Sequence, residues 1–350
     1  YSGKLTESKA KDALTLSMAL KTKEQIGLTG NAAAIFPLAT VALAKDDALG
    51  AAVVANVTDT ASAQSAFTAF APDVNGATRA LAISLTDQAT GPVGARQRAL
   101  RMYANQDSDY TLWGQEFAQN LNQQNSSESP GFRDSGFGFA LGADGGNPSA
   151  GRYGGAFTFF SGDASDKQPR TSKTTLDWYM LSGYTDWRGK GFFLDTQITA
   201  GYGNLKGRRV INLYDNGDPT QPLAFSREAD SKRGSLMGAG GVSTGVIYAW
   251  GSTVLTPQLS LDGLTMREDG YTETNGGDGF DLKVNPYYTN SLRGYFGTSL
   301  RGDCYRGDRG RHPEARIGYR YDFLNGAQKV QAAFASGAGA DFQLTVRDRA

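Results

Sequence analysis

The chain has 350 residues, of which 35 are lysine or arginine and 35 are aspartate or glutamate. This balance gives no net positive field, so no nucleic-acid partner is expected. One cysteine, Cys304, excludes an intrachain disulfide, and one histidine, His312, argues against a metal site, so neither a metal nor another cofactor is expected.

The first 105 residues contain alanine-rich stretches with helical spacing, at residues 9–19, 48–55, 61–70, 80–85 and 93–104. Asp59 and Asp73 stand where helix N-caps are expected. No run approaches the roughly 18 consecutive apolar residues that a membrane-spanning helix needs. This region is therefore predicted to be helical.

The last helix of this region, at residues 92–105, carries arginine on all its sides. Arg96, Arg98 and Arg101 are distributed around it, so it has no wide apolar stripe, and Asn105 ends it. Two interpretations remain open. It is either a solvated surface helix or, because it directly precedes the first predicted strand, a helix that lies in a polar pore.

From residue 110 onward, apolar and polar residues alternate in about ten strand-length runs, at residues 110–119, 136–144, 152–159, 176–185, 191–205, 236–248, 255–262, 292–300, 315–323 and 330–334. A soluble sandwich would also alternate, with its polar face outside. Here the polar face holds glycine and charged residues, while the apolar face is rich in aromatic residues, which suits a barrel with lipid outside and water inside. The predicted fold is therefore all-β, an antiparallel up-and-down transmembrane β-barrel with an N-terminal helical segment.

The alternation assigns side chains to the two faces of the predicted barrel wall. The residues expected to face the lumen are Asp144, Arg152, Asp177, Asp195, Asp262, Arg293, Arg316, Arg320 and Asp322. The residues expected to face lipid are Phe137, Phe139, Phe157, Trp178, Leu194, Ile198, Tyr202, Leu259, Ile317 and Tyr319. Glycines on the lumen face, such as Gly142 and Gly203, are expected either to leave room for a helix or to form bulges.

The connections between the predicted strands alternate in length. Short, turn-like connections lie at residues 145–150, 188–190, 250–252 and 324–327, and long polar ones at 122–130, 163–172, 206–232 and 267–280. Short turns at one end and long loops at the other are typical of an outer-membrane barrel.

Five stretches resemble, in this order, the translocator end of bacterial autotransporters, the type V secretion proteins. They are RQRALRMY at 96–103, LWGQ at 112–115, GFGFALGAD at 136–144, GFFLD at 191–195 and PEARIGY at 313–319. Each stretch alone has low specificity, but their order within residues 71–333, with a helix first and hairpins after it, is typical of the family.

This resemblance implies a barrel of about twelve strands, about ten of them present here, with one helix plugging the pore. It implies a helical passenger end or linker at residues 1–91, a pore-spanning helix at 92–105 and the barrel at 106–350. The implied location is the outer membrane of a Gram-negative bacterium, with the upstream passenger at the cell surface. The implied partners of this monomer are outer-membrane lipid, its own passenger, the barrel-assembly machinery and periplasmic chaperones.

Two features depart from the family pattern. Family members end in a strand with a terminal aromatic residue, whereas this chain ends with VRDRA at 346–350, so the last two strands are expected to be missing. Between residues 301 and 312 the alternation gives way to dense charge, which fits either a long charged loop or a divergent stretch.

The function expected on these grounds is that of a translocator and anchor which helps to export its passenger, and not that of an enzyme. The alternatives are a passive porin-type channel and a soluble β-rich binding domain. One chemical alternative is self-cleavage at Asn105, activated by the inward carboxylates Asp144, Asp177 and Asp195.

Overall fold

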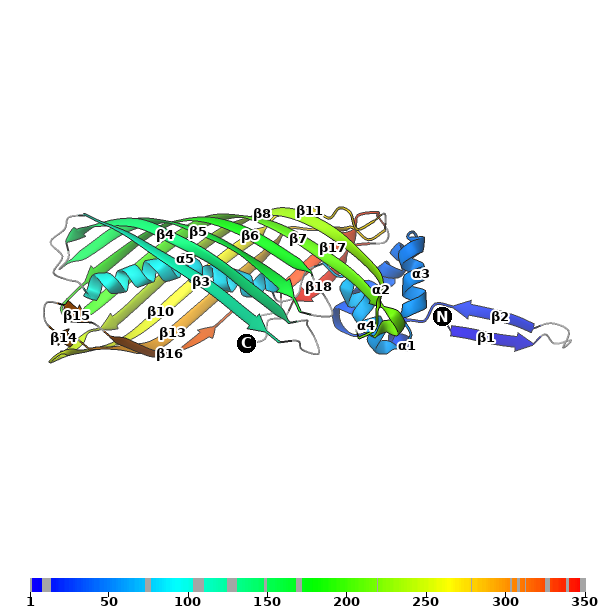
Figure 1. Ribbon diagram of the computed structural model, residues 1–350, viewed down its shortest axis with the longest axis horizontal. Helices are drawn as coiled ribbons and strands as arrows, with labels where there is room; N and C mark the ends of the chain where they lie inside the picture. The colour runs from blue at the N-terminus through cyan, green and yellow to red at the C-terminus, as the bar shows by residue number, and fades with distance from the viewer. Residues whose placement is uncertain are drawn as a thin grey trace.

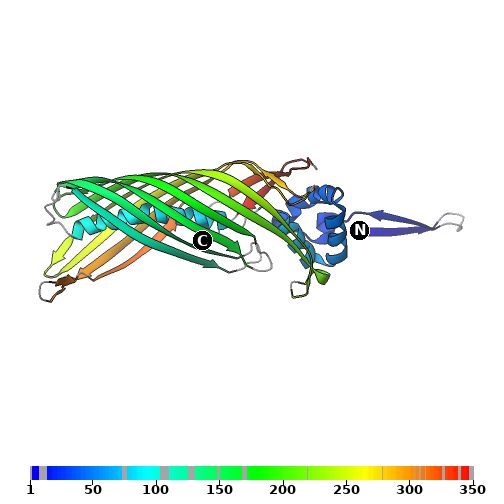
Figure 2. The same ribbon diagram turned by 45° about the horizontal axis from the view of Figure 1, so that its top comes forward.

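The computed structural model shows a long, curved antiparallel sheet that wraps around one helix (Figure 1). A group of short helices and a small second sheet lie at one end of it, and the view in Figure 2 shows the same arrangement. The structure describes residues 2–7, 14–72, 77–102, 110–124, 131–147, 150–167, 172–218, 220–277, 279–302, 304–306, 309–311, 313–324, 328–337 and 340–346.

The helices are α1 (Lys23–Ile26), α2 (Gly30–Leu43), α3 (Asp47–Asn56), α4 (Thr60–Ala69) and α5 (Ala77–Met102), with a 3-10 turn η1 (Asp215–Gly217). The curved sheet contains β3 (Tyr110–Gln123), β4 (Phe132–Asn147), β5 (Gly151–Asp166), β6 (Lys173–Arg188), β7 (Phe192–Tyr214), β8 (Leu223–Val246), β9 (Tyr248–Trp250), β10 (Thr253–Glu268), β13 (Tyr287–Gly302) and β16 (Glu314–Asp322). The other strands are β1 (Ser2–Glu7), β2 (Leu14–Ala19), β11 (Tyr271–Thr272), β12 (Leu282–Val284), β14 (Cys304–Arg306), β15 (Arg309–Arg311), β17 (Gln328–Phe334) and β18 (Phe342–Val346).

We call the curved sheet the wall. Its strands pair in the order β16-β13-β10-β8-β7-β6-β5-β4-β3, each antiparallel to its neighbour, and β9 pairs only with β10. This is the predicted up-and-down topology. The tenth predicted run is not part of the wall, because β17 belongs to a second sheet with β11, β12 and β18. Among the described residues no pairing joins β3 to β16, so the wall forms a half-barrel.

The charged stretch at residues 301–312 contains a short hairpin. Its described residues form β14 and β15, which pair as a separate two-stranded sheet.

Among the described residues, no helix combines the length and the apolar character that crossing a membrane requires.

The convex face of the wall carries a band of exposed apolar side chains with aromatic residues at both borders. Toward the short turns, the border residues are Tyr153, Trp187, Phe192, Tyr248 and Trp250. At the other border, Phe139, Phe159, Tyr179 and Tyr202 are successive register partners on four strands. From Tyr179 to Trp187 the strand rises about 26 Å, or about 20 Å at a tilt of about 40°. This height is close to the apolar band of about 25 Å that a membrane barrel presents between its aromatic girdles.

Most of the side chains expected to face lipid lie on this convex face: Phe137, Phe139, Phe157, Leu194, Ile198, Tyr202, Leu259, Ile317 and Tyr319. The prediction for Trp178 is wrong, because its side chain is 0% exposed and points into the concave face with Leu176 and Met180. The prediction for Asp177 fails for the same reason. Because adjacent residues of a strand point to opposite faces, Asp177 lies on the convex face, just outside the aromatic border, where it accepts a hydrogen bond from Ser161 Oγ at 2.7 Å.

The wall strands continue well past the apolar band at the end away from the short turns. β7 runs on from Tyr202 to Tyr214 and pairs with β8 throughout, so the prediction of a loop at residues 206–232 is wrong. The outward side chains there are charged. Arg208 lies 3.4 Å from Glu228 and 3.5 Å from Asp230, which is the solvated pattern of a strand outside lipid. We call this end the long-loop end.

Helices α1 to α4 form a cap on the long-loop end, and we use this name for residues 20–71 (Figure 1). The helical prediction holds for α3 and α4, where Asp59 caps α4 by accepting the Ser62 N–H. It is wrong at residues 14–19, which form β2 in a hairpin with β1. Asp73 lies outside the described residues.

The cap and the long-loop end share one hydrophobic core. Ile35, Phe36 and Phe70 from the cap pack in the same buried cluster as Phe280 and Leu282. A buried charged pair supports this contact. Arg209 donates to both carboxylate oxygens of Glu273 at 2.6 to 3.1 Å and to the Phe280 carbonyl at 2.6 Å, and its Nη1 donates to the Ala69 carbonyl of the cap at 3.4 Å. The cap is therefore packed on the wall and is not a free helical segment.

An ion pair between Asp46 of the cap and Arg227 of β8 gives this docking a pH dependence. Burial raises the pKa of the Asp46 carboxyl, but hydrogen bonds from Arg227 and from the Leu49 N–H outweigh it, so the pKa lies below its ordinary 3.8. A lowered folded-state pKa stabilises the folded state above the unfolded pKa, and this stabilisation is lost as the pH falls through the folded value. We expect amide protection factors in α3 to fall below pH of about 4. Hydrogen exchange should show this loss in the natural chain and not in Asp46→Asn; an equal loss in both would contradict it.

Candidate functional site

Helix α5 lies along the concave face of the wall (Figures 1 and 2). It runs from the cap to the end of the wall where β3 begins. Its 26 residues, Ala77–Met102, begin well before the predicted start at residue 92 and span about 39 Å. Asn105, expected to end this helix, lies outside the described residues.

The first anchor of α5 is an arginine on a buried carboxylate. Arg96 donates from Nε and Nη2 to the two oxygens of Asp144, at 2.6 and 3.0 Å. The hydroxyl of Tyr184 donates to the same carboxylate at 2.9 Å, and Arg152 Nη1 lies 3.4 Å from it. Trp113 Nε1 in turn donates to the Tyr184 hydroxyl at 2.7 Å. A two-pronged, charge-assisted contact of this kind fixes the orientation of the arginine as well as its position.

The second anchor lies one and a half turns further along the helix. Arg101 binds Asp195 and lies 3.8 Å from Asp186, and its guanidinium sits 3.9 Å from the centre of the Phe193 ring. Between the two anchors, Gln97 Nε2 donates to the carbonyls of Thr185 and Thr196 at 2.9 and 3.0 Å. These contacts tie the C-terminal half of α5 to β6 and β7.

In the third anchor, the helix supplies the acid and the wall supplies the arginines. Asp87 accepts hydrogen bonds from Arg293 at 2.9 and 3.2 Å and from Arg320 at 3.1 Å. Nine residues separate Asp87 from Arg96, and at about 100° per residue they point to opposite sides of the helix. The helix is therefore held between β4, which carries Asp144, on one side and β13 and β16 on the other, while Arg101, about 40° around the helix from Asp87, binds Asp195 of β7. A rotation or a one-turn slip would break anchors on both sides.

The remaining predicted lumen residues also lie on the concave face. Asp262 is opposite Arg293 in the register, Arg316 is opposite Ser299, and Asp322 accepts a hydrogen bond from Ser291 Oγ at 3.1 Å. Arg98 borders a small cavity of about 100 Å³ together with Glu314. Arg293 and Arg320 of the wall bind Asp87 of the helix.

Sequence reasoning missed Asp87, Asp186, Gln97 and Tyr184. Only for Asp87 was a signal present, because it is the one acidic residue between 77 and 102, in a helix that otherwise carries arginine. Such a lone acid is a candidate partner for inward arginines. Tyr184 shares the face of its strand with Trp178, which the alternation predicts to face lipid, so its hydrogen bonds could not be expected.

The concave face between the anchors is packed with apolar side chains. Trp178, Met180 and Met237 belong to a buried cluster on it, and Val93 of α5 packs against Ala156 and Tyr184. The Trp178 ring lies over Gly203 and the Trp113 ring over Gly142, where a Cβ atom would clash with the ring. The space left by these glycines is thus taken by rings of the neighbouring strand, and not by the helix.

The chemistry available here is that of reversible charge pairing. Buried carboxylates and guanidinium groups hold a helix in one register, and these contacts are lost together if the helix leaves. Among the residues that the structure describes, no group of three or more His, Cys, Asp or Glu side chains is placed to hold a metal ion.

Comparison with known proteins identifies the family. The model of the autotransporter beta-domain matches residues 112–350, which is well over half of the chain. Comparison with curated proteins finds no match.

Three solved structures are similar at low identity. The translocator domain of the autotransporter NalP from Neisseria meningitidis is 12% identical with a TM-score of 0.49, and the match covers 78% of this chain and 97% of that one. The beta domain of the Bordetella autotransporter BrkA is 18% identical with a TM-score of 0.44, over 67% and 90% of the chains. The transport unit of the autotransporter AIDA-I from Escherichia coli is 12% identical with a TM-score of 0.41, over 71% and 82%. The family match over the wall establishes that this chain belongs to the autotransporters, and that its β-domain is an outer-membrane translocator.

Proposed function

We propose that this translocator delivers its own N-terminal passenger to the cell surface and then holds it there, with α5 as both the plug of the pore and the tether. The observation that carries the proposal is the pair of opposite anchors, Asp87 on one side of α5 and Arg96 on the other. A passive porin-type channel does not need a helix that specific contacts with the wall fix in one register.

The direction in which α5 runs supports a position of the cap on the cell-surface side of the membrane. α5 begins beside the cap at the long-loop end and ends near the start of β3, at the end with the short turns (Figure 1). In outer-membrane barrels the longer loops are extracellular and the short turns periplasmic. On this basis the cap lies outside the membrane, and any passenger that precedes it lies at the cell surface.

The remaining parts of the proposal follow from family membership. Outer-membrane lipid would surround the apolar band, and barrel-assembly machinery and periplasmic chaperones would act during insertion of a monomer. The proposed role is transport and anchoring, not catalysis.

Plugging is tested by conductance in planar lipid bilayers. A chain that starts at residue 103, and so lacks both the cap and α5, is expected to form open channels, whereas the full chain conducts little. A chain that starts at residue 77 keeps α5 and is the matched control, which should stay nearly closed. Equal conductance of all three chains would favour the porin-type alternative.

A further inference from the structure

The small cavity beside Arg98 lies on the concave face, between the C-terminal half of α5 and the strands β10, β13 and β16. Its volume of about 100 Å³ leaves room for several water molecules or for one small ion. The anchors in this half of α5 reach β4, β6 and β7, on the other strands of the wall. The cavity is therefore a gap in the contacts between the helix and the wall.

The charges around this cavity do not balance. Its lining contains three arginines, Arg98, Arg101 and Arg301, and a single acid, Glu314. Arg101 already binds Asp195, and Glu314 lies directly opposite Arg301 in the register of β13 and β16. Whichever of the other two arginines Glu314 neutralises, one positive charge is left over. An anion in the cavity would offset it.

Arg98 is the arginine of this lining that the helix directs at the gap. It is half-buried, and within the part of the chain that the structure describes its guanidinium has no hydrogen-bond or ion-pair partner. Withdrawing a charge from water without such a partner is costly. A further arginine strengthens the positive field, because Arg316 is the register partner of Ser299, which lines the cavity. The site therefore favours a negative ligand.

Uncharged hydrogen-bonding groups line the same cavity. Thr256 and Gln258 of β10 are each 9% exposed, and Ser299 of β13 is the register partner of Thr256. Among the described residues, none of these three side chains has a hydrogen-bond partner. Hydroxyl and primary amide groups can each donate a hydrogen bond. Donors from one helix and two strands thus surround one small volume, an arrangement that suits an ion with several oxygen atoms.

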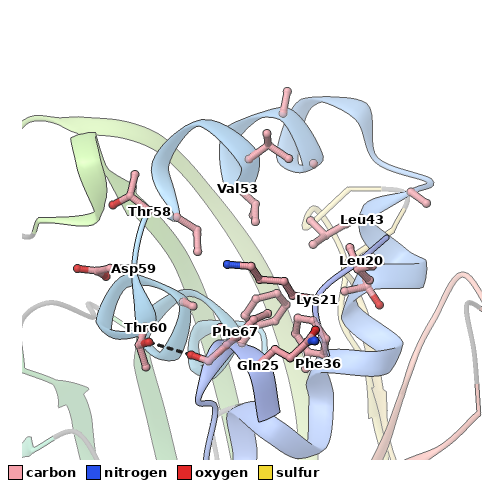
Figure 3. Close-up of a pocket in the computed structure, with 18 of the residues that line it drawn as sticks. Leu20, Lys21, Gln25, Phe36, Leu43, Val53, Thr58, Asp59, Thr60 and Phe67 are labelled. Carbon is pink, nitrogen blue, oxygen red and sulfur yellow. Dashed lines mark hydrogen bonds between the residues drawn. The ribbon is translucent and has the colours of Figure 1, made fainter. Parts of the chain in front are cut away.

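The larger cavity of the cap offers no comparable selection. It has a volume of about 560 Å³ and opens between α2, α3 and α4, and charges of both signs line it, on Lys21 as well as on Asp47 and Asp59 (Figure 3). Part of its polar lining is bonded within the cap, since Thr60 Oγ1 donates to the Ile26 carbonyl at 2.8 Å. The lining of the cap cavity therefore favours no single class of ligand.

We propose that the cavity beside Arg98 binds a free inorganic phosphate ion, which links α5 to β10 and β13. Arg98 supplies the charge-assisted contact. The phosphate ion has further oxygen atoms to accept hydrogen bonds from Thr256, Gln258 and Ser299. The ion thus completes the attachment of the C-terminal half of α5, on the side that the three anchors leave open.

The test is equilibrium binding of radiolabelled inorganic phosphate to the full chain in phosphatidylcholine nanodiscs, with chloride holding the ionic strength constant. Saturable binding of one phosphate per chain is expected. Arg98→Gln removes the charge and should weaken binding about tenfold or more. Thr256→Val keeps the shape of the side chain but loses the hydroxyl, and should weaken it about threefold. Arg208→Gln is the matched control, because Arg208 is 56% exposed beside Glu228 and outside the lumen, so phosphate binding should be unchanged.

Hydrogen exchange provides a second measurement. Saturating phosphate should slow amide exchange at residues 96–102 of the natural chain and not of Arg98→Gln, because the ion joins α5 to the wall. The proposal is overturned if the natural chain binds no more phosphate than empty nanodiscs do, or if Arg98→Gln binds it equally well. It is also overturned if phosphatidylglycerol in the nanodisc blocks phosphate binding, since a lipid headgroup would then occupy the site. These measurements do not involve conductance or export, so they separate this site from the proposed function.

Discussion

Replacing Asp144 by alanine is expected to destabilise the protein by about 3–5 kcal/mol, because it removes one partner of a buried ion pair. The change leaves Arg96 and Arg152 without their carboxylate, and Tyr184 without its acceptor, at a point where the Asp144 side chain is 0% exposed. The free energy of unfolding can be measured by denaturant titration of the protein in lipid vesicles.

Asp163→Ala is the matched control for this variant. Asp163 also belongs to an ion pair, 3.5 Å from Lys173, but its side chain is 40% exposed, so the loss should stay below about 1 kcal/mol. Equal losses of stability in the two variants would mean that the concave face is as accessible to solvent as the protein surface, and that the anchor contributes little to the free energy of unfolding. Conductance should separate them as well, since only Asp144→Ala loosens the plug.

Ile198→Arg is expected to cost about 2–4 kcal/mol and to lower the yield of inserted protein, because it places a charge at the middle of the apolar band. Ile198 is 72% exposed on the convex face of β7, between Leu194 and Tyr202. The fraction of protein that is inserted can be measured by its resistance to protease and to cold SDS.

Asn204→Arg tests whether position or charge causes this loss. Asn204 lies on the same face of the same strand, two residues past Tyr202 and beside Lys206, outside the aromatic border. An arginine there should insert as well as the natural residue does. If Ile198→Arg inserted equally well, the convex face would not be the lipid face.

The positions of the wall strands were predictable because a period of two is local information. Nine of the ten runs became wall strands, and Ile198 and Asp195 took the faces that the alternation gave them. The rule failed at Trp178 and Asp177 because it equates apolar with outward. A wall packed around a helix has an apolar interior too, and on β6 the larger apolar side chains fill it.

The pairing of charges was far less predictable than the faces on which they lie. Arg293 and Asp87 are 206 positions apart in the chain, and no local pattern relates the rotation of α5 to the register of the wall. The cap shows the same limit. Two of its helices, α3 and α4, were recognisable from alanine spacing, but α2 was not predicted. It buries one stripe of residues that includes Ala32, Ile35 and Ala39, and the sequence does not indicate which surface covers this stripe.

The shared core of the cap and the long-loop end has a consequence for the order of folding. Asn31 exchanges two hydrogen bonds of 3.0 Å with Thr345, across 314 positions of the chain, and Phe70 packs on Phe280. Contacts of such high sequence separation form late, because long loops must close before the contacts contribute. The cap, which the ribosome makes before the wall, is thus among the last parts to reach its final packing. Until its distant partners are in place, the cap lacks part of its hydrophobic core. A chain that is not yet fully packed can pass through a narrow opening.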